Sequence, residues 1–295
     1  MAFDQIAIEP LTFVHTPQID RILTRGVGYL QAGFPLHFRG RAGTGKTTLA
    51  SMAAQAIDRP VVILYGNDDY MAVDLLGERI GYRRRIIDDN YIHNVRKYED
   101  TLTHRWVDSK LTEACKEGWV LIYDEFNRSR AETNNTLLSI LEEHLLVYPI
   151  GISRSPVPVH EDFRAIFTSN PDEYAGAHPA PDALLDRMIT ISLDCFDEET
   201  ELAIAVYNTE ATPEMCRPLI AAVRRLRESA SLPIWLSLRT SIMLVRLVTA
   251  RSVGISWGNE TFRDLFTDVI LGHLPVQQAK KTRTIIDATC RELLP

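Results

Sequence analysis

Cysteine is scarce in this sequence, and its cysteines form no recognisable pattern. The 295-residue chain has no C-x-x-C pair, and its four cysteines are scattered at Cys115, Cys195, Cys216 and Cys290. This spacing indicates neither a metal centre built on paired cysteines nor a disulfide framework. We interpret the four as reduced residues that pack in the interior of a cytoplasmic protein.

Long hydrophobic runs are also missing. No apolar stretch approaches the ~18 residues that a membrane-spanning helix requires. Residues 1–5 lack the basic and apolar regions of a secretory signal, and the chain has no internal repeat or low-complexity tract. We therefore expect neither a membrane protein nor a secreted one.

Positive charge is in the minority. Lysine and arginine together number 32 against 39 acidic residues, which gives a formal net charge of −7. This balance argues against a nucleic-acid-binding protein that depends on overall positive charge, although it allows a local basic patch. The length suffices for one large domain or two modest ones.

A glycine-rich motif is the most informative feature that the sequence does have. It has the pattern Gly-x-x-x-x-Gly-Lys-Thr and stands between an expected strand and an expected helix. In that context backbone N–H groups and the helix N-terminus face phosphate oxygens, the lysine reaches the β and γ phosphates, and the threonine hydroxyl ligates Mg²⁺. A glycine-rich turn that matches by chance is the alternative. The residues expected to bind nucleotide are Gly40, Arg41, Ala42, Gly43, Thr44, Gly45, Lys46, Thr47 and Thr48.

The first two-thirds of the chain alternate strand and helix patterns, which predicts an α/β fold with a parallel sheet between helices. Helices are expected from Thr16-Pro17, from Asp108 to Glu117 with Gly118 at the end, and from a capping box at 129–132. Near-continuous apolar runs predict five buried strands, at residues 36–39, 61–65, 119–123, 163–168 and 188–193.

The pattern becomes entirely helical from Asp197 onward. We predict an α/β domain over residues 1–195, a small helical lid domain over 196–274 and a C-terminal helical tail over 275–295. Helices are expected at 198–208, from Thr212-Pro213, at 238–252 ending at Gly254, at 259–272 and, in the tail, at 277–294.

An acidic pair follows the third expected strand. At the end of a buried strand, Asp124 is placed to hold Mg²⁺ and Glu125 to orient or deprotonate a nucleophilic water. The alternative is a solvated loop start. Because the pair follows a phosphate-loop motif by roughly 80 residues of βα pattern, we favour the catalytic interpretation.

Two further polar residues fit the same chemistry. Asn170 follows an apolar strand and is placed to hydrogen-bond the γ-phosphate or the water, although it also suits a turn before Pro171. Arg187 stands between a short helix and the last strand. It is either a solvated arginine or a guanidinium that stabilises charge on the transferred phosphoryl group.

Taken together, these motifs resemble the AAA+ ATPases. The sequences at 74–77, 124–128 and 138–143 are similar to those of the MoxR-type branch. Longer segments resemble gas vesicle members of that branch, at 30–40, 106–112, 122–126 and 167–176. The resemblance covers about residues 9–250. It implies an AAA+ P-loop NTPase fold with a helical lid, and hydrolysis of ATP with Mg²⁺.

The resemblance also implies individual roles. Lys46 and Thr47 match Walker A, Asp124 and Glu125 match Walker B, and Asn170 matches sensor 1. Arg187 matches an arginine finger that acts on the neighbouring subunit's nucleotide. Arg239 matches sensor 2, although Leu238 stands where the family usually has a proline or a small residue.

Two segments have no assigned role. Residues 81–105 are basic with interleaved tyrosines, which indicates a solvated insertion, a surface for the pore or a protein partner, or, least favoured, a nucleic-acid contact. The segment 148–155 is shorter than the glycine-containing linker that gas vesicle relatives often have at this place. A shorter hairpin there would alter the surface that a ring presents to its substrate.

The resemblance implies an ATP-driven assembly factor for gas vesicles, a hexameric ring that remodels or inserts the shell protein or accessory proteins. It would be cytoplasmic and associated with gas vesicles. A general MoxR-like chaperone that matures another complex is the second hypothesis. A nucleic-acid-dependent motor is the third, and a small-molecule kinase is less favoured still.

Overall fold

The structure of the chain is a computed structural model. It describes residues 13–80, 85–87, 97–99, 105–148, 155–170, 178, 181–229, 232, 235–272, 274 and 276–294. Its residues group into two compact units. The first contains Gly26–Phe38 and Ala50–Ile191, and the second contains Arg39–Leu49 and Ser192–Pro295. The phosphate-loop motif therefore groups with the helical residues, and the predicted boundary near 195 stays a prediction.

A five-stranded parallel sheet forms the centre of the fold, as predicted. The spatial order is β11-β1-β10-β7-β2. In the register, Ile122 of β7 lies beside Ile166 of β10 and Ile63 of β2. The bounds are β1 (Leu36–Gly40), β2 (Val61–Tyr65), β7 (Val120–Asp124), β10 (Arg164–Ser169) and β11 (Ile189–Leu193).

A buried histidine links three of these strands. His37 of β1 is 1% exposed. Its Nε2 lies 2.9 Å from the Ser169 hydroxyl of β10, and its Nδ1 lies 3.0 Å from the Thr190 hydroxyl of β11. A buried ring with both nitrogens paired satisfies its polar atoms without water.

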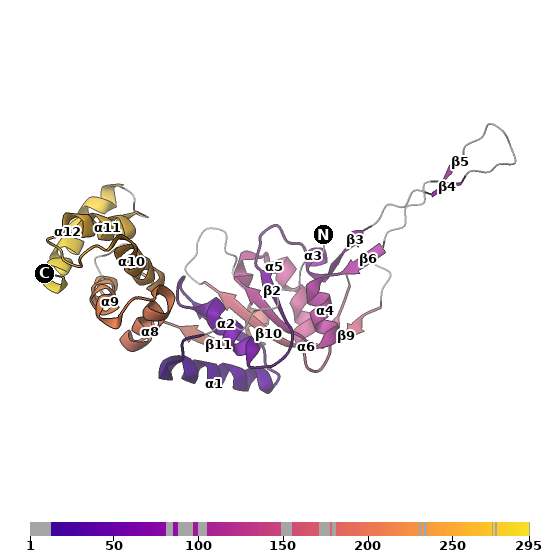
Figure 1. Cartoon of the computed structure of the whole chain (residues 1–295). Helices are drawn as coiled ribbons and strands as arrows, with labels where there is room; N and C mark the ends of the chain where they lie inside the picture. The colour runs from indigo at the N-terminus through magenta and orange to yellow at the C-terminus, as the bar shows by residue number, and fades with distance from the viewer. Residues whose placement is uncertain are drawn as a thin grey trace. The chain divides into compact units, whose positions relative to one another are not determined.

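Helices pack beside the sheet (Figure 1). Helix α4 packs on β2 and β7 and buries Leu111, Ala114 and Cys115. This burial raises the pKa of the Cys115 thiol to about 12. The bounds are α1 (Pro17–Gln31), α2 (Lys46–Gln55), α3 (Ala72–Leu76), α4 (Lys110–Glu117), α5 (Ala131–Asn134), α6 (Thr136–Glu142) and α7 (Asp182–Leu185).

The ends of α4 follow sequence rules. The Ser109 side chain accepts a hydrogen bond from the Thr112 N–H, and Gly118 has the left-handed φ of 72° that commonly ends a helix. Gly118 is thus confirmed as the helix end, while the helix begins two residues later than the predicted Asp108.

The predicted capping box at residues 129–132 is wrong. Ser129 is fully buried, and its hydroxyl accepts hydrogen bonds from the Tyr123 hydroxyl at 2.7 Å and the Asn67 N–H at 3.0 Å. The cap position of α5 is instead Arg130, whose side chain makes no capping bond. The buried Tyr123 hydroxyl of β7 and the Asn67 N–H just past β2 both donate to the serine oxygen, so it is not available to the helix.

Short antiparallel pairs interrupt the α/β pattern, and the sequence did not predict them. They are β3 (Gly77–Ile80) with β6 (Arg105–Asp108), β4 (Arg85–Ile87) with β5 (Lys97–Glu99), and β8 (Leu145–Leu146) with β9 (Val157–Pro158). Most of the basic segment 81–105 and residues 149–154 of the linker lie outside the described residues.

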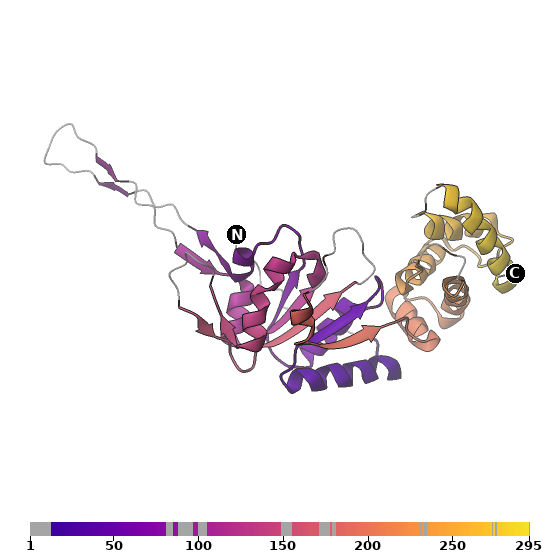
Figure 2. The same ribbon diagram turned by 180° about the vertical axis from the view of Figure 1, so that it is seen from behind.

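Five helices form a bundle in the second unit, and Figure 2 shows them from behind. They are α8 (Glu198–Thr209), α9 (Pro213–Arg227), α10 (Leu238–Arg251), α11 (Glu260–Leu271) and α12 (Val276–Leu293). Ile286 and Cys290 of α12 are fully buried in the same apolar cluster as Val223 of α9 and Phe266 of α11. The predicted tail helix is therefore part of the bundle core.

The residue that ends α10 differs from the prediction. The helix ends at Arg251 and its C-cap is Ser252, which is left-handed with φ 50°, and not Gly254. No helix in the described part of the chain is long and apolar enough to cross a membrane.

Candidate functional site

The glycine-rich motif connects β1 to α2, as the sequence predicted. Gly40 ends the strand, Lys46 begins the helix, and Gly43 and Gly45 have φ of 78° and 80°. A Cβ on Gly40 would lie 2.6 Å from the Leu193 carbonyl oxygen. A side chain at these positions would strain or displace the backbone, so the loop requires glycine.

Lys46 is folded onto this loop. Its ammonium donates to the carbonyl oxygens of Gly40 at 2.8 Å and Arg41 at 2.9 Å, and only 8% of the residue is exposed. Thr44 donates to the same Arg41 carbonyl at 2.9 Å. Thr47 and Thr48 follow in the first turn of α2 and are exposed. A cationic group thus lies at the centre of a loop suited to anions.

Residues of the helical unit surround the loop. A Cβ on Gly43 would lie 2.5 Å from Ser237 and 3.9 Å from the Cβ of Arg239, and the Trp235 ring lies under the Arg41 guanidinium at 4.5 Å. Arg239 is in the first turn of α10. The structure therefore brings the motif and Arg239 together. A cavity of about 10 Å³ beside the motif is lined by Gly43, Thr44, Cys195, Phe196, Glu201, Trp235, Ser237 and Leu238.

The acidic pair ends β7 at a hydrogen-bonded junction with β10. Asp124 is 7% exposed and accepts a 2.6 Å hydrogen bond from the Thr168 hydroxyl. The same Thr168 oxygen accepts the backbone N–H of Glu125 at 2.9 Å. Thr168 thus fixes the Asp124 carboxylate and the Glu125 backbone with one side chain.

Asn170 lies one residue beyond β10 and is 5% exposed. Its carbonyl oxygen accepts a hydrogen bond of 3.1 Å from the Asn127 side chain, which follows the acidic pair. The ends of the neighbouring strands β7 and β10 are therefore tied together where Asp124, Glu125 and Asn170 stand.

Glu125 has an unusual backbone and a charged partner. Its φ is 52°, a left-handed conformation that a non-glycine residue rarely adopts. Its carboxylate accepts from the Arg128 Nε at 2.7 Å. Non-glycine residues held in this region are often found at functional sites.

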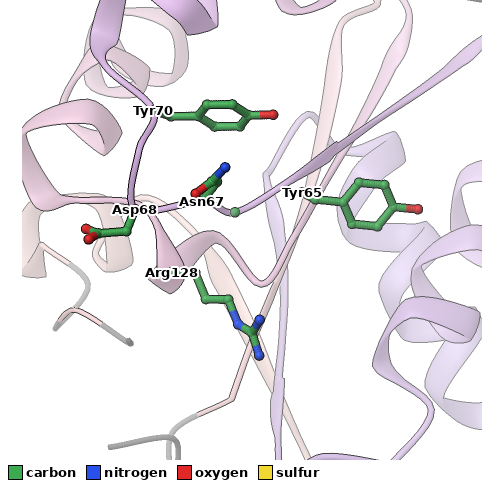
Figure 3. Close-up of a pocket in the computed structure, with 6 residues that line it drawn as sticks. Tyr65, Asn67, Asp68, Tyr70 and Arg128 are labelled. Carbon is green, nitrogen blue, oxygen red and sulfur yellow. The ribbon is translucent and has the colours of Figure 1, made fainter. Parts of the chain in front are cut away.

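A pocket of about 400 Å³ adjoins this turn (Figure 3). Tyr65, Gly66, Asn67, Asp68, Tyr70 and Arg128 line it. Arg130 donates to Asp68 at 3.0 Å, and His178 lies 2.8 Å from the same oxygen. The hydrogen bond from Arg130, followed by that from His178, lowers the pKa of the Asp68 carboxyl.

Arg187 does not join the acidic pair. Its guanidinium pairs with Glu142 at the end of α6, with an Nε–Oε2 distance of 2.9 Å, and also donates to the Ala183 carbonyl. The side chain is 29% exposed. The residues near Asp124 are thus Glu125, Thr168 and Asn170, and Arg187 lies elsewhere on the same unit.

Sequence reasoning assigned no role to three residues of these sites: Thr168, Arg128 and Trp235. Thr168 is two residues before Asn170 on an apolar strand, and only the strand order reveals that it lies beside Asp124. Arg128 follows Glu125 by three residues, a spacing that allows contact in a helical turn. Trp235 precedes Arg239 by four residues, which is a weak signal.

The chemistry of two predicted ligands suits Mg²⁺. Thr47 and Asp124 offer hydroxyl and carboxylate oxygens, the ligands that Mg²⁺ prefers. A Cβ on Gly40 would meet the Leu193 carbonyl oxygen and the Thr44 hydroxyl, so only glycine allows the loop to pack this closely after β1.

Comparison with known proteins gives concordant matches. The family model described as AAA domain (dynein-related subfamily) matches residues 35–188. The gas vesicle ATPase GvpN of Ancylobacter aquaticus is 44% identical, over 88% of this chain and 72% of that protein. The GvpN of Haloferax mediterranei is 38% identical, over 92% and 76%. The structure of NtrX from Brucella abortus in complex with ADP has a TM-score of 0.56 at 15% identity, covering 95% of this chain and 64% of that one.

Proposed function

Because this chain belongs to the AAA domain family and, within it, to the gas vesicle ATPases GvpN, we propose that its ATP hydrolysis drives the assembly of gas vesicles. The ATPase activity is a property of the family. The assembly role, the site residues and the partners are the proposal. The observation that carries it is that one chain has both the strand–loop–helix motif at Gly40–Lys46 and the hydrogen-bonded junction of Asp124, Thr168 and Glu125.

ATP would be bound through its phosphates by residues 40–48. The Lys46 ammonium exchanges the carbonyl oxygens of Gly40 and Arg41 for the more strongly accepting phosphate oxygens. Arg239 would add a second cation to the phosphates, which the closeness of its Cβ to Gly43 supports. Thr47 and Asp124 would hold Mg²⁺, which neutralises charge on the phosphates during transfer.

Glu125 would act as the general base, and Asn170 would orient the attacking water or the γ-phosphate. Thr168 holds the Asp124 carboxylate and the Glu125 backbone, so these two groups start from defined positions. Proper placement of such groups before reaction contributes much of the catalysis of phosphoryl transfer.

Arg187 would complete the site of a neighbouring subunit. Its pairing with Glu142, away from Asp124 and Glu125, supports a role outside its own subunit's site. A subunit without its neighbour would bind ATP but lack one positive charge at the transition state. This requirement means that the catalytic unit is an oligomer. We favour a hexameric ring.

The client would be a gas vesicle shell or accessory protein, and the ring would associate with growing vesicles. The identity of 44% and 38% to proteins named gas vesicle ATPase GvpN supports this assignment over a general chaperone.

The test is the Glu125→Gln variant in a gas-vesicle-forming host, scored by buoyancy and electron microscopy. We expect vesicles to stop as small immature particles, because the ring binds ATP but does not turn it over. Glu132→Gln, an exposed residue in the first turn of α5, is the matched control and should give full-sized vesicles. Full-sized vesicles at normal yield with Glu125→Gln would contradict the proposal.

A further inference from the structure

The backbone of Glu125 is fixed from several directions. Its N–H donates to Thr168, and its carbonyl oxygen accepts the Arg128 N–H at 2.9 Å. A Cβ on Gly66 would lie only 2.0 Å from that carbonyl oxygen, so the end of β2 is pressed against this peptide. The backbone is therefore rigid, whereas the side chain still has three rotatable bonds.

Arg128 restrains that side chain. It ends the 3₁₀ turn Phe126–Arg128, and its Nε lies 2.7 Å from Glu125 Oε2. The hydrogen bond between Glu125 and Arg128 backbone groups closes the same turn. Glu125 and Arg128 are therefore held in one short turn. Because the turn already restricts both residues, forming the ion pair costs less conformational entropy than it does for an ordinary exposed pair.

Asp68, which lines the neighbouring pocket, has different partners. Asp68 is engaged by Arg130 and His178. Figure 3 shows the Arg128 guanidinium pointing away from Asp68. The two arginines therefore contact different carboxylates: Arg128 contacts Glu125, the proposed base, and Arg130 contacts Asp68.

We propose that Arg128 is a positioning residue for Glu125. It holds the carboxylate by Oε2, so that Oε1 faces the water. The water oxygen then attacks the γ-phosphorus, its proton passes to Oε1, and ADP departs with the electron pair of the broken P–O bond. This inference rests on the proposed role of Glu125 as the base.

The size of the effect follows from placement and not from stability. An exposed ion pair stabilises a fold little, because solvent screens it. A base displaced by about 1 Å, in contrast, can lose on the order of a hundredfold in rate. Removal of Arg128 should therefore change turnover while leaving folding and nucleotide binding nearly intact.

The experiment compares Arg128→Gln with wild type in the full chain. We expect kcat to fall by roughly tenfold or more, with KM for ATP and the affinity for a fluorescent ATP analogue changed by less than about twofold. Arg128→Lys should recover part of kcat, because it restores the charge with different geometry. Arg130→Gln is the matched control and should keep wild-type kcat. An unchanged or raised kcat in Arg128→Gln would overturn the proposal.

A double-mutant cycle makes the test specific. If Arg128 acts through Glu125, then Arg128→Gln lowers kcat no further in the Glu125→Gln background. Additive losses would show that it acts elsewhere and would overturn the inference. Urea unfolding of the same four proteins is the folding control: because the exposed ion pair stabilises the fold little, the four midpoints should lie close together. A Glu125→Gln single variant that keeps wild-type kcat would mark a failure of the proposed role of Glu125 as the base. A failure of the proposed ATPase cycle is thereby distinguished from a failure of this assignment.

Discussion

Thr168 on β10 donates its hydroxyl proton to Asp124 on β7 across 2.6 Å, and its oxygen accepts the Glu125 N–H. Thr168→Val keeps the shape and removes both bonds. We expect kcat to fall by roughly tenfold or more, because both acidic residues lose their fixed positions. The free energy of unfolding should fall by about 1–3 kcal/mol, because buried polar groups are left unpaired.

Thr168→Ser is the control for this change. It keeps the hydroxyl and loses only a methyl group, so it should retain most of kcat. Steady-state turnover and urea unfolding of the two variants are the measurements. Equal loss of kcat in both would indicate that packing, and not the hydroxyl, matters at this position.

Position 66 requires glycine because the Glu125 peptide lies too close to leave space for a side chain. Gly66→Ala places a Cβ 2.0 Å from the Glu125 carbonyl oxygen, so this peptide or the end of β2 must move. We expect a loss of about 1–3 kcal/mol in the free energy of unfolding, as for other overpacked sites, together with reduced kcat. Gly28→Ala in α1, where a Cβ has no neighbour within 4 Å, should instead stabilise the fold by roughly 0.5–1 kcal/mol. Thermal unfolding and turnover of both variants test this contrast.

The sequence predicts the sheet well and its contacts poorly. Apolar runs located all five strands to within one residue at each end, since strands buried on both faces must be almost continuously apolar. Strand order has no comparable signal. That Thr168 lies beside Asp124 depends on β10 pairing with β7, strands that are separated in the chain by α5 and α6.

Ser129 illustrates why local rules fail at a buried site. The sequence around it matches a capping box, but Tyr123 and Asn67 both donate to its hydroxyl. Those donors come from two different strand ends, so only the folded structure places them together. The same holds for Arg239, whose neighbour Gly43 lies almost 200 residues earlier in the sequence.

Arg187 should act between subunits. Arg187→Ala is expected to keep ATP affinity and to lose turnover by a factor on the order of 10³–10⁵, as for other arginine fingers. Lys46→Ala should lose nucleotide binding and hence turnover. Mixed rings of the two variants should recover turnover, because an intact Arg187 then faces an ATP-loaded neighbour. Two inactive variants that stay inactive after mixing would contradict a role in trans, and size-exclusion chromatography would check that mixed rings form.

Trp235 should report nucleotide binding. Its ring lies 4.5 Å from the Arg41 guanidinium, and the adjoining cavity of about 10 Å³ has no space for a nucleotide base. Binding of ATP to residues 40–48 draws Arg41 and Lys46 toward phosphate, so Arg41 leaves or shifts on the indole while Arg227 stays at 5.8 Å. We expect a change in tryptophan emission on addition of ATP that disappears in Trp235→Phe. Trp257 is 3% exposed and packs against Phe262 and Phe266, so Trp257→Phe should keep the change. A full-sized response in Trp235→Phe would place the signal at another tryptophan and contradict the contact as a sensor of the loop.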